Sequence, residues 1–283
     1  MYYVWELLNH ITNLLVPITD NPRFEAELLL AHSLKVSRSH LLANIREKIE
    51  PPEILNELIS ERLKHKPIAY ILGYTEFYSL KIFTQPPVFI PRPETELLVD
   101  KAINLIKHSD KNFFRLLELC TGTGCISIAI FKNVTKPISI YATDISKEAI
   151  HLAVQNATYH NVNIGFLLAD LFSPFASRSF FDIIVCNPPY VSLEEWQSLS
   201  TAIKEYEDKN ALLSGDNGLQ IIRDIVNQSK QYLVNGGYLL FEIGENQRED
   251  VLMLLSSAGY TNIEIFCDLQ NLPRVAMCKW VAK

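Results

Sequence analysis

The segment Asn187-Pro188-Pro189-Tyr190 has the clearest chemical meaning, because it directly follows an apolar run typical of a buried strand. Proline fixes its φ angle and lacks an N–H group, so the Pro188 carbonyl is held in one direction. The Asn187 side-chain oxygen and this carbonyl are two acceptors for the N–H bonds of a planar amino group, and Tyr190 can stack on its plane. The tetrapeptide predicts a site that orients such a nitrogen. The alternative, an ordinary proline turn, does not explain Asn187 at the end of a strand.

A glycine-rich turn upstream joins an apolar strand to an apolar helix, and consists of Cys120, Thr121, Gly122, Thr123 and Gly124. Glycines let the backbone approach a ligand closely, and a helix N-terminus offers free N–H groups. Ser127 stands where the dinucleotide pattern GxGxxG has its third glycine, which argues against a dinucleotide. The turn alone is also compatible with a simple strand-to-helix connection.

Two carboxylates follow the next two expected strands. Asp144 stands where an acidic side chain can accept both hydroxyls of a ribose, although capping of the following helix is the simpler role. Asp170 could accept a hydrogen bond from an adenine amino group, and taken alone it indicates only a solvated loop acid. The glycine turn and Asp144 together favour a nucleoside ligand.

Two regions of different periodicity flank a proline-rich joint. Residues 1–66 repeat apolar side chains at helical spacing and predict a small helical bundle. Residues 67–93 are rich in β-branched and aromatic residues and end in prolines, which predicts a hairpin and a stiff extended linker. Strands and helices alternate in residues 94–283, which is typical of a mostly parallel α/β sheet covered on both faces. The last two strands, expected at 263–267 and 274–280, can only pair as an antiparallel hairpin.

Composition narrows the classes of function. The chain has 48% apolar residues, 20% charged residues and a net charge of −6, which does not favour a generic nucleic-acid binder. None of the five cysteines forms a C-x-x-C pair, so neither a zinc site nor a disulfide framework is predicted, and no metal is expected. The N-terminus lacks a basic leader, and no apolar run reaches the roughly 20 residues of a membrane span. We expect a reduced, soluble, cytoplasmic protein.

The order of these motifs resembles the HemK/PrmC family of protein glutamine methyltransferases, within the class that uses S-adenosyl-L-methionine. The resemblance covers nearly the whole chain and is carried by KPIAYILGYTEFY, IPRPETELLVD, CNPPYVS and GGYLLFEIGENQ. It implies a Rossmann-like class I methyltransferase domain with a mostly parallel seven-stranded sheet, preceded by the helical domain and hairpin linker. It also implies methylation of the glutamine in the GGQ motif of peptide chain release factors, with S-adenosyl-L-homocysteine as the second product.

The resemblance assigns roles to the residues. Asn187, Pro188 and Tyr190 are implied to be catalytic, and with Pro189 they bind the substrate amide. The Cys120–Gly124 turn would take the methionine end of the cofactor, Asp144 its ribose, and Asp170 with Leu171 its adenine, while Asn187 also borders the cofactor. The helical domain is expected to recognise the release factor. A monomer without stable nucleic-acid or membrane binding is expected.

The chain departs from the family pattern at two places. Cys120 stands where the family usually has glycine, and is expected to adopt an ordinary backbone conformation and to narrow the pocket slightly. The segments 207–212 and 214–218 lack a proline and shift an acidic residue relative to the family, which leaves the details of that loop open.

Three other functions fit parts of this pattern. Methylation of the adenine amino group in DNA or RNA uses the same tetrapeptide chemistry, but the acidic charge and the helical domain count against it. Methylation of a glutamine in a ribosomal protein differs only in the partner, and the N-terminal half resembles the release-factor branch. A cofactor-binding interaction protein without turnover would not need an intact Asn-Pro-Pro-Tyr.

Overall fold

The computed structural model describes residues 1–282, which form two compact units. The first unit comprises Met1–Tyr74 together with Ser200–Tyr206. The second comprises Thr75–Leu199 and the chain from Glu207 to the end of the described residues. The short segment at 200–206, which the sequence interpretation placed with the C-terminal region, therefore belongs to the helical unit.

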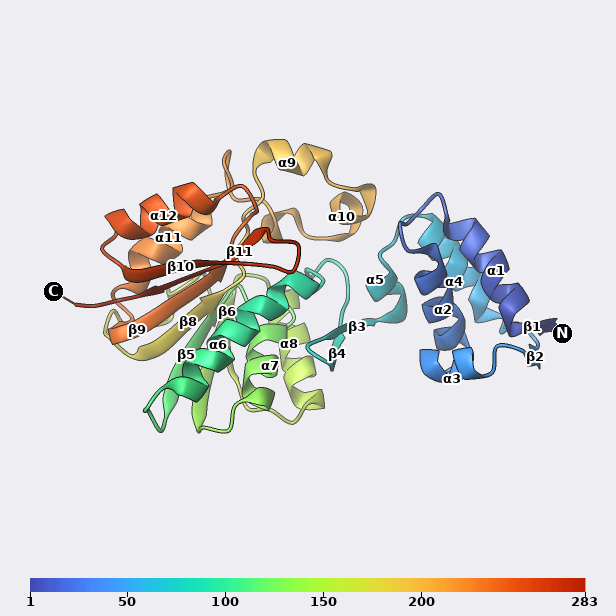
Figure 1. Cartoon of the computed structure of the whole chain (residues 1–283), viewed down its shortest axis with the longest axis horizontal. Helices are drawn as coiled ribbons and strands as arrows, with labels where there is room; N and C mark the ends of the chain where they lie inside the picture. Colours follow the sequence, from blue (N-terminus) through green and yellow to red (C-terminus); the bar gives the residue numbers. More distant parts are fainter. Residues whose placement is uncertain (283) are drawn as a thin grey trace. The chain divides into compact units, whose positions relative to one another are not determined.

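The first unit contains a helical bundle of α1 (Val4–Leu15), α2 (Pro22–Ser33), α3 (Arg38–Ala43), α4 (Ile54–Leu63) and α5 (Ile68–Leu72) (Figure 1). The short helix α10 (Thr201–Tyr206) also belongs to this unit. The apolar residues of α1 recur at helical spacing, and five of them are buried: Val4, Leu7, Leu8, Ile11 and Leu15. A buried ion pair joins Arg62 on α4 to Glu25 on α2, with 2.6 Å between Nε and Oε2. Two-residue strands β1 (Tyr2–Tyr3) and β2 (Lys48–Ile49), which the sequence did not indicate, pair antiparallel.

The second unit contains the predicted seven-stranded sheet, in the order β10-β11-β9-β8-β5-β6-β7. Its strands are β5 (Phe114–Leu119), β6 (Ile138–Asp144), β7 (Gly165–Leu168), β8 (Phe181–Cys186), β9 (Leu233–Glu242), β10 (Thr261–Cys267) and β11 (Pro273–Lys279). Strands β5 to β9 pair parallel, and β11 pairs antiparallel with both β9 and β10. This confirms the mostly parallel sheet and its antiparallel final pair.

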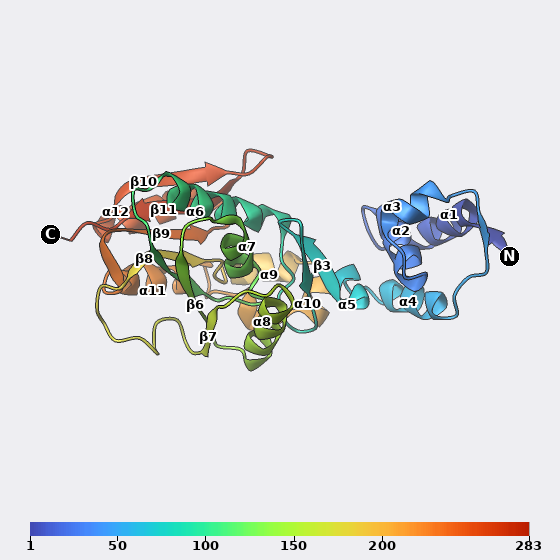
Figure 2. The same ribbon diagram turned by 90° about the horizontal axis from the view of Figure 1, so that it is seen from below.

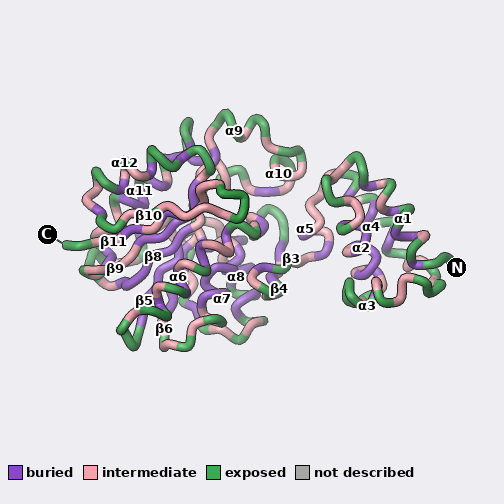
Figure 3. The backbone as a smooth tube through the Cα atoms, in the orientation of Figure 1, coloured by how far each residue is buried: buried purple, intermediate pink, exposed green. Residues whose placement is uncertain are grey.

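Helices cover both faces of this sheet (Figures 1 and 2). One face carries α6 (Glu96–His108), α7 (Cys125–Asn133) and α8 (Lys147–Tyr159), and the other carries α11 (Gln220–Ser229) and α12 (Arg248–Ser257). Successive residues of β5 point to opposite layers, because Leu116 packs in the α6–α7 core and Leu117 in the α11–α12 core. The central strands are accordingly buried along their length (Figure 3). The two short helices α9 (Leu193–Ser198) and α10 follow β8 and were not expected from the sequence.

Two local expectations were wrong. Residues 68–72, interpreted as part of a hairpin, form α5, and the hairpin is limited to β3 (Tyr74–Phe77) and β4 (Leu80–Phe83). Burial of Ala69, Tyr70 and Leu72 within that helix outweighs the local preference for strand. Strand β9 was expected to begin after the Gly236-Gly237 pair, but it includes both glycines, where its pairing with β8 is irregular.

The register of the parallel strands brings their carboxyl ends to one edge. Leu119, the last residue of β5, pairs with Thr143 of β6 and with Cys186 of β8, and Asp144 pairs with Leu168 of β7. The chain runs outward from β5 to β7 and then returns to place β8 on the other side of β5. Such a reversal of strand order leaves a crevice at the carboxyl ends of the two strands, where doubly wound sheets bind ligands.

The structure contains no helix within residues 1–282 whose length and hydropathy would allow it to cross a membrane.

Asn156 attaches the hairpin to the sheet domain. Its completely buried side chain accepts a hydrogen bond from Phe83 N–H (2.7 Å) and donates to the carbonyls of Phe83 (3.1 Å) and Thr123 (2.9 Å). Because Thr123 belongs to the glycine-rich turn, this amide also fixes the start of α7.

Replacing Asn156 by alanine leaves the N–H of Phe83 and the carbonyls of Phe83 and Thr123 without their partner. We expect Asn156→Ala to lower the free energy of unfolding by about 2–4 kcal/mol, measured by urea denaturation. The control is Gln155→Ala, one residue earlier on an exposed position of the same helix, with an expected change within about 0.5 kcal/mol. Equal losses in both variants would contradict the anchoring role.

Candidate active site

A cavity of about 770 Å³ opens where β5, β6, β7 and β8 end. Its size is that of a site for a small organic ligand. Most of the sequence-predicted site residues line it: Cys120, Thr121, Gly122, Thr123, Asp144, Asp170, Leu171, Asn187, Pro188, Pro189 and Tyr190. These residues come from four loops that are separate in sequence, and the sheet brings them together.

Gly124 is the one predicted residue that does not line the cavity. It is the N-cap of α7 with a φ of +78°, and a Cβ atom built on it would lie 3.1 Å from the Cβ of Ala153. Its small size therefore serves the close contact of α7 with α8.

Asp144 holds the glycine turn with its carboxylate. Oδ2 accepts a hydrogen bond from Gly122 N–H at 2.8 Å, and Oδ1 accepts one from Ser146 N–H at 2.9 Å. The N-cap of α8 is Ser146, whose hydroxyl accepts from Ala149 N–H, so Asp144 is not the capping residue itself. Burial raises the pKa of the Asp144 carboxyl above its usual value. A ligand that donates hydroxyl hydrogen bonds to this carboxylate would favour its charged form.

The backbone of Cys120 contradicts the expectation of an ordinary conformation. Its φ angle is +54°, in the left-handed region that a glycine occupies without strain. The residue directly follows β5, and the turn is fixed on both sides, by the pairing of Leu119 and by the bond from Gly122 N–H to Asp144. These constraints impose the conformation on a cysteine at a cost of roughly 1–2 kcal/mol. Leu171, at the adenine end of the predicted site, also has a positive φ, of +42°.

A buried hydroxyl in the cavity wall favours a polar ligand. Thr143 lines the cavity, and its Oγ1 atom lacks a hydrogen-bond partner among residues 1–282. A buried hydroxyl without a partner is unfavourable, so this group is suited to a ligand with polar atoms. Beneath the turn, the fully buried Glu118 accepts from Ser127 N–H (3.1 Å), and burial raises its pKa to about 7.

The Asn187 side chain is held through its nitrogen. Nδ2 donates to the hydroxyl of Thr95 at 3.1 Å, and that hydroxyl donates to Oε2 of Glu242 at 2.6 Å. Thr95 ends the short 3₁₀ turn Pro93–Thr95, and Glu242 is the last residue of β9. The amide oxygen of Asn187 is consequently turned away from Thr95.

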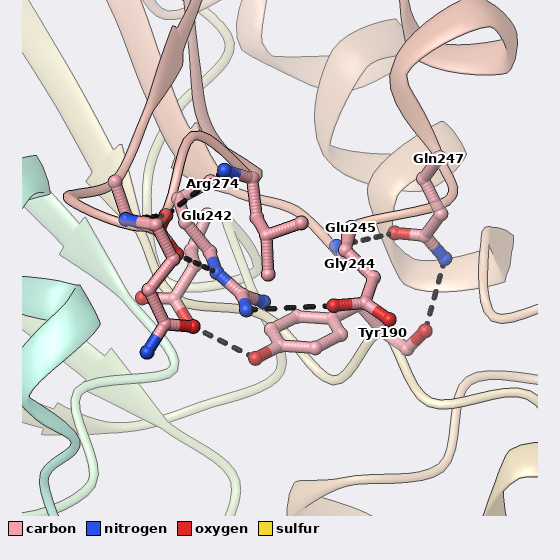
Figure 4. A network of polar contacts seen from close by, with 9 residues as sticks. Tyr190, Glu242, Gly244, Glu245, Gln247 and Arg274 are labelled. Atoms are coloured by element: carbon pink, nitrogen blue, oxygen red, sulfur yellow. Dashed lines mark hydrogen bonds and ion pairs between the residues drawn. The ribbon is translucent and has the colours of Figure 1, made fainter.

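Tyr190 is fixed at both its hydroxyl and its backbone (Figure 4). The hydroxyl donates to Oε1 of Glu242 at 3.0 Å, and the carbonyl accepts from Nε2 of Gln247 at 2.9 Å. Gln247 is held in turn by Gly244 N–H, which donates to its Oε1 at 2.9 Å. Burial raises the pKa of the Tyr190 hydroxyl, which keeps it a hydrogen-bond donor.

The segment that departs from the family pattern forms one wall of the cavity. Glu207 is buried, pairs with Arg92, and accepts a hydrogen bond from Ile90 N–H at 3.4 Å. Asp208 N–H donates to the carbonyl of Pro87 at 2.8 Å. The loop is thus attached to the proline-rich segment despite its missing proline.

Four positioning residues were not selected from the sequence: Thr95, Gly218, Glu242 and Gln247. Three of them stand within the motifs IPRPETELLVD and GGYLLFEIGENQ that carry the family resemblance. Their positions were visible, but their contact with the Asn-Pro-Pro-Tyr segment required the fold.

Several known proteins are similar to this chain in sequence. The chain matches the PrmC N-terminal domain family over residues 6–73 and the Methyltransferase small domain family over residues 80–205. A release factor glutamine methyltransferase of Thermodesulfovibrio yellowstonii is 38% identical over 259 residues, covering 89% of this chain and 90% of that protein. A release factor glutamine methyltransferase of Coxiella burnetii is 37% identical over 283 residues, covering 99% of each.

A solved structure of a methyltransferase from Pyrococcus furiosus has the same fold. It superposes with a TM-score of 0.52 at 14% identity and covers 73% of this chain and 91% of that chain.

Gly218 leaves room for the Tyr190 carbonyl. A Cβ atom on Gly218 would lie 2.1 Å from the Tyr190 oxygen and 2.7 Å from Nε2 of Gln247. We expect Gly218→Ala to lower the free energy of unfolding by about 2–4 kcal/mol, measured by urea denaturation, because it adds this clash to the strain of a positive φ.

Gly215→Ala is the matched control. Gly215 has a φ of +71°, close to the +72° of Gly218, but its Cβ would meet only the Cβ of Gln220 at 3.3 Å. The control should therefore lose only about 1 kcal/mol. A Gly218 variant no less stable than the Gly215 variant would show that the Tyr190 carbonyl is not sterically confined.

Proposed function

The chain belongs to the family of release factor glutamine methyltransferases, and we propose that it methylates the side-chain amide of the glutamine in the GGQ motif of a peptide chain release factor. The full-length similarity to proteins of that activity supports this proposal. The observation that carries it is the orientation of Asn187: its nitrogen is bonded to Thr95, so its oxygen is left for a substrate.

The cavity fits S-adenosyl-L-methionine, the cofactor of the family. Its volume is suitable, its wall offers the unpaired hydroxyl of Thr143, and the Asp144 carboxylate suits ribose hydroxyls. When bound, the cofactor supplies a methyl group that its sulfonium centre has already activated. We assign the Cys120–Thr123 turn to its methionine end, Asp144 to its ribose, and Asp170 with Leu171 to its adenine.

The chemistry left to the protein is orientation. An amide nitrogen is a poor nucleophile, because its lone pair is delocalised into the carbonyl. We infer that Asn187 Oδ1 and the Pro188 carbonyl accept the two N–H bonds of the glutamine amide, which fixes the direction of the nitrogen lone pair. Both acceptors also stabilise the positive charge that develops on that nitrogen during transfer. Tyr190 and the two prolines hold the amide plane.

The first unit is proposed to recognise the release factor. It matches the PrmC N-terminal domain family, and none of the residues lining the cavity belongs to it. We further propose that the protein acts in the cytoplasm as a monomer and does not bind nucleic acid stably, consistent with its net charge of −6.

Asn187→Ala removes one of the two acceptors and keeps the Cys120–Thr123 turn, Asp144 and Asp170 of the cofactor site. We expect kcat to fall by about 10²–10³-fold, while the Kd for S-adenosyl-L-methionine changes less than about threefold. Transfer of labelled methyl to release factor and calorimetric titration of cofactor measure the two quantities. The control Asn163→Ala changes an exposed residue before β7 and should retain wild-type kcat. Undiminished turnover of the Asn187 variant would overturn its catalytic assignment.

The substrate is identified by the position of the label. Release factor should be labelled, whereas a GGQ→GGA release factor and double-stranded DNA should not. Label on DNA adenine, or on a ribosomal protein in place of the release factor, would support one of the other methyltransferase activities, and no label on any substrate would support a binding protein without turnover.

Deleting residues 1–66 tests the role of the helical unit. We expect methylation of whole release factor to fall at least about tenfold more than cofactor affinity, because the cavity lies outside the deleted region. Equal losses of methyl transfer and of cofactor affinity would instead indicate that residues 1–66 only stabilise the fold.

A further inference from the structure

We propose that Thr95, backed by Glu242, is a positioning residue that determines which end of the Asn187 amide faces the substrate. The inference rests on the proposed function of Asn187. It concerns a different question, namely how an amide with two ends of similar shape is held with its oxygen toward the reacting nitrogen.

The three residues form one continuous chain of hydrogen bonds. Asn187 Nδ2 lies 3.1 Å from Thr95 Oγ1, and Thr95 Oγ1 lies 2.6 Å from Glu242 Oε2. Thr95 and Glu242 are 2% and 1% exposed, so water does not compete for the hydrogen bond between them. The 3₁₀ turn Pro93–Thr95 carries Thr95, and the end of β9 carries Glu242. Both elements therefore contribute to the orientation of Asn187, which directly follows β8.

The donor and acceptor in each of these hydrogen bonds follow from the number of protons available. An ionised carboxylate only accepts hydrogen bonds, and a threonine hydroxyl has a single proton to donate. That proton is used on Glu242, so the Thr95 oxygen can only accept from its other neighbour. Asn187 must therefore present its NH₂ group to Thr95, and its oxygen faces the cavity.

The same carboxylate also orients Tyr190. Its second oxygen, Oε1, accepts the Tyr190 hydroxyl at 3.0 Å (Figure 4). Glu242 thus holds the first and last residues of Asn-Pro-Pro-Tyr, one through Thr95 and one directly. Rotation of the Asn187 side chain breaks its hydrogen bond to Thr95, and rotation of the Tyr190 side chain breaks its hydrogen bond to Glu242.

Protonation of Glu242 would reverse the direction of donation in the hydrogen bonds that link Glu242, Thr95 and Asn187. A proton on Oε2 would be donated to Thr95, whose own proton would then point to Asn187 and select its oxygen. The groups facing Glu242 are Tyr190, Arg274 on β11, Glu94 on the 3₁₀ turn and Cys125 at the start of α7. Burial is the largest influence and raises the pKa of Glu242, while Thr95, Tyr190 and Arg274 oppose it. The group is charged above that pKa, so catalysis should decline as the pH falls through it.

Paired variants of Thr95 test the proposal in the full-length protein. Thr95→Val keeps the shape of the side chain and removes the hydroxyl, and we expect kcat to fall about 10- to 100-fold. Thr95→Ser keeps the hydroxyl and should restore kcat to within about threefold. The Kd for S-adenosyl-L-methionine should change less than about threefold in both variants. Full activity of the valine variant, equal impairment of both, or a parallel loss of cofactor affinity would overturn the proposal.

The dependence of kcat on pH distinguishes an orienting role of Glu242 from a role in packing alone. Wild-type kcat should decline at low pH, and Glu242→Gln, which cannot titrate, should have a lower kcat without that decline. An unchanged low-pH decline in the glutamine variant would contradict the role of Glu242.

A spectroscopic measurement keeps this inference distinct from the proposed function. The side-chain NH₂ resonances of Asn187 in ¹⁵N-labelled protein should move in Thr95→Val and remain near their wild-type positions in Thr95→Ser. If wild-type protein does not methylate release factor, the proposed function fails, whereas unmoved resonances in the valine variant refute the hydrogen-bond chain itself.

Discussion

The parallel pairing of β5 with β8 is the constraint on which the site depends. Leu119 and Cys186 are the last residues of the two strands and lie opposite each other, so the glycine turn and the Asn-Pro-Pro-Tyr segment begin side by side. One segment is suited to a nucleoside ligand and the other to a planar amide. A shift of one residue in this register would turn alternate side chains to the opposite layer of the core and separate the two segments.

Rigidity of the site comes from a few buried polar groups rather than from the loops themselves. Asp144 holds the glycine turn, Asn156 holds the turn and the hairpin, and Glu242 holds both ends of the Asn-Pro-Pro-Tyr segment. Each makes two or more hydrogen bonds, at least one of them to a segment distant in sequence. Loops positioned in this way can carry chemistry that depends on orientation, because their polar groups keep a fixed direction.

Several features of the fold could be predicted from local pattern, and others could not. Alternation of strand and helix in residues 94–283 was sufficient to predict the mostly parallel sheet, since consecutive parallel strands are joined through helices. Helix α5 was missed because its aromatic and β-branched residues favour a strand locally, and its burial decides otherwise. Cys120 was assigned an ordinary conformation, and only the fixed ends of its turn impose a positive φ.

The amino-acid sequence by itself determined the type of chemistry. Asn187 carries both an acceptor and a donor, and the two prolines after it fix the direction of the Pro188 carbonyl, so the segment can orient a planar amino group. The glycine turn with Asp144 suits a nucleoside. These properties reside in the residues and their order. The tertiary structure decided which end of Asn187 is presented. That choice depends on Thr95 and Glu242, which lie 92 and 55 residues away and approach Asn187 only when the 3₁₀ turn and β9 meet the end of β8. Hydrogen-bond direction is a property of contacts across the fold, and no local pattern encodes it.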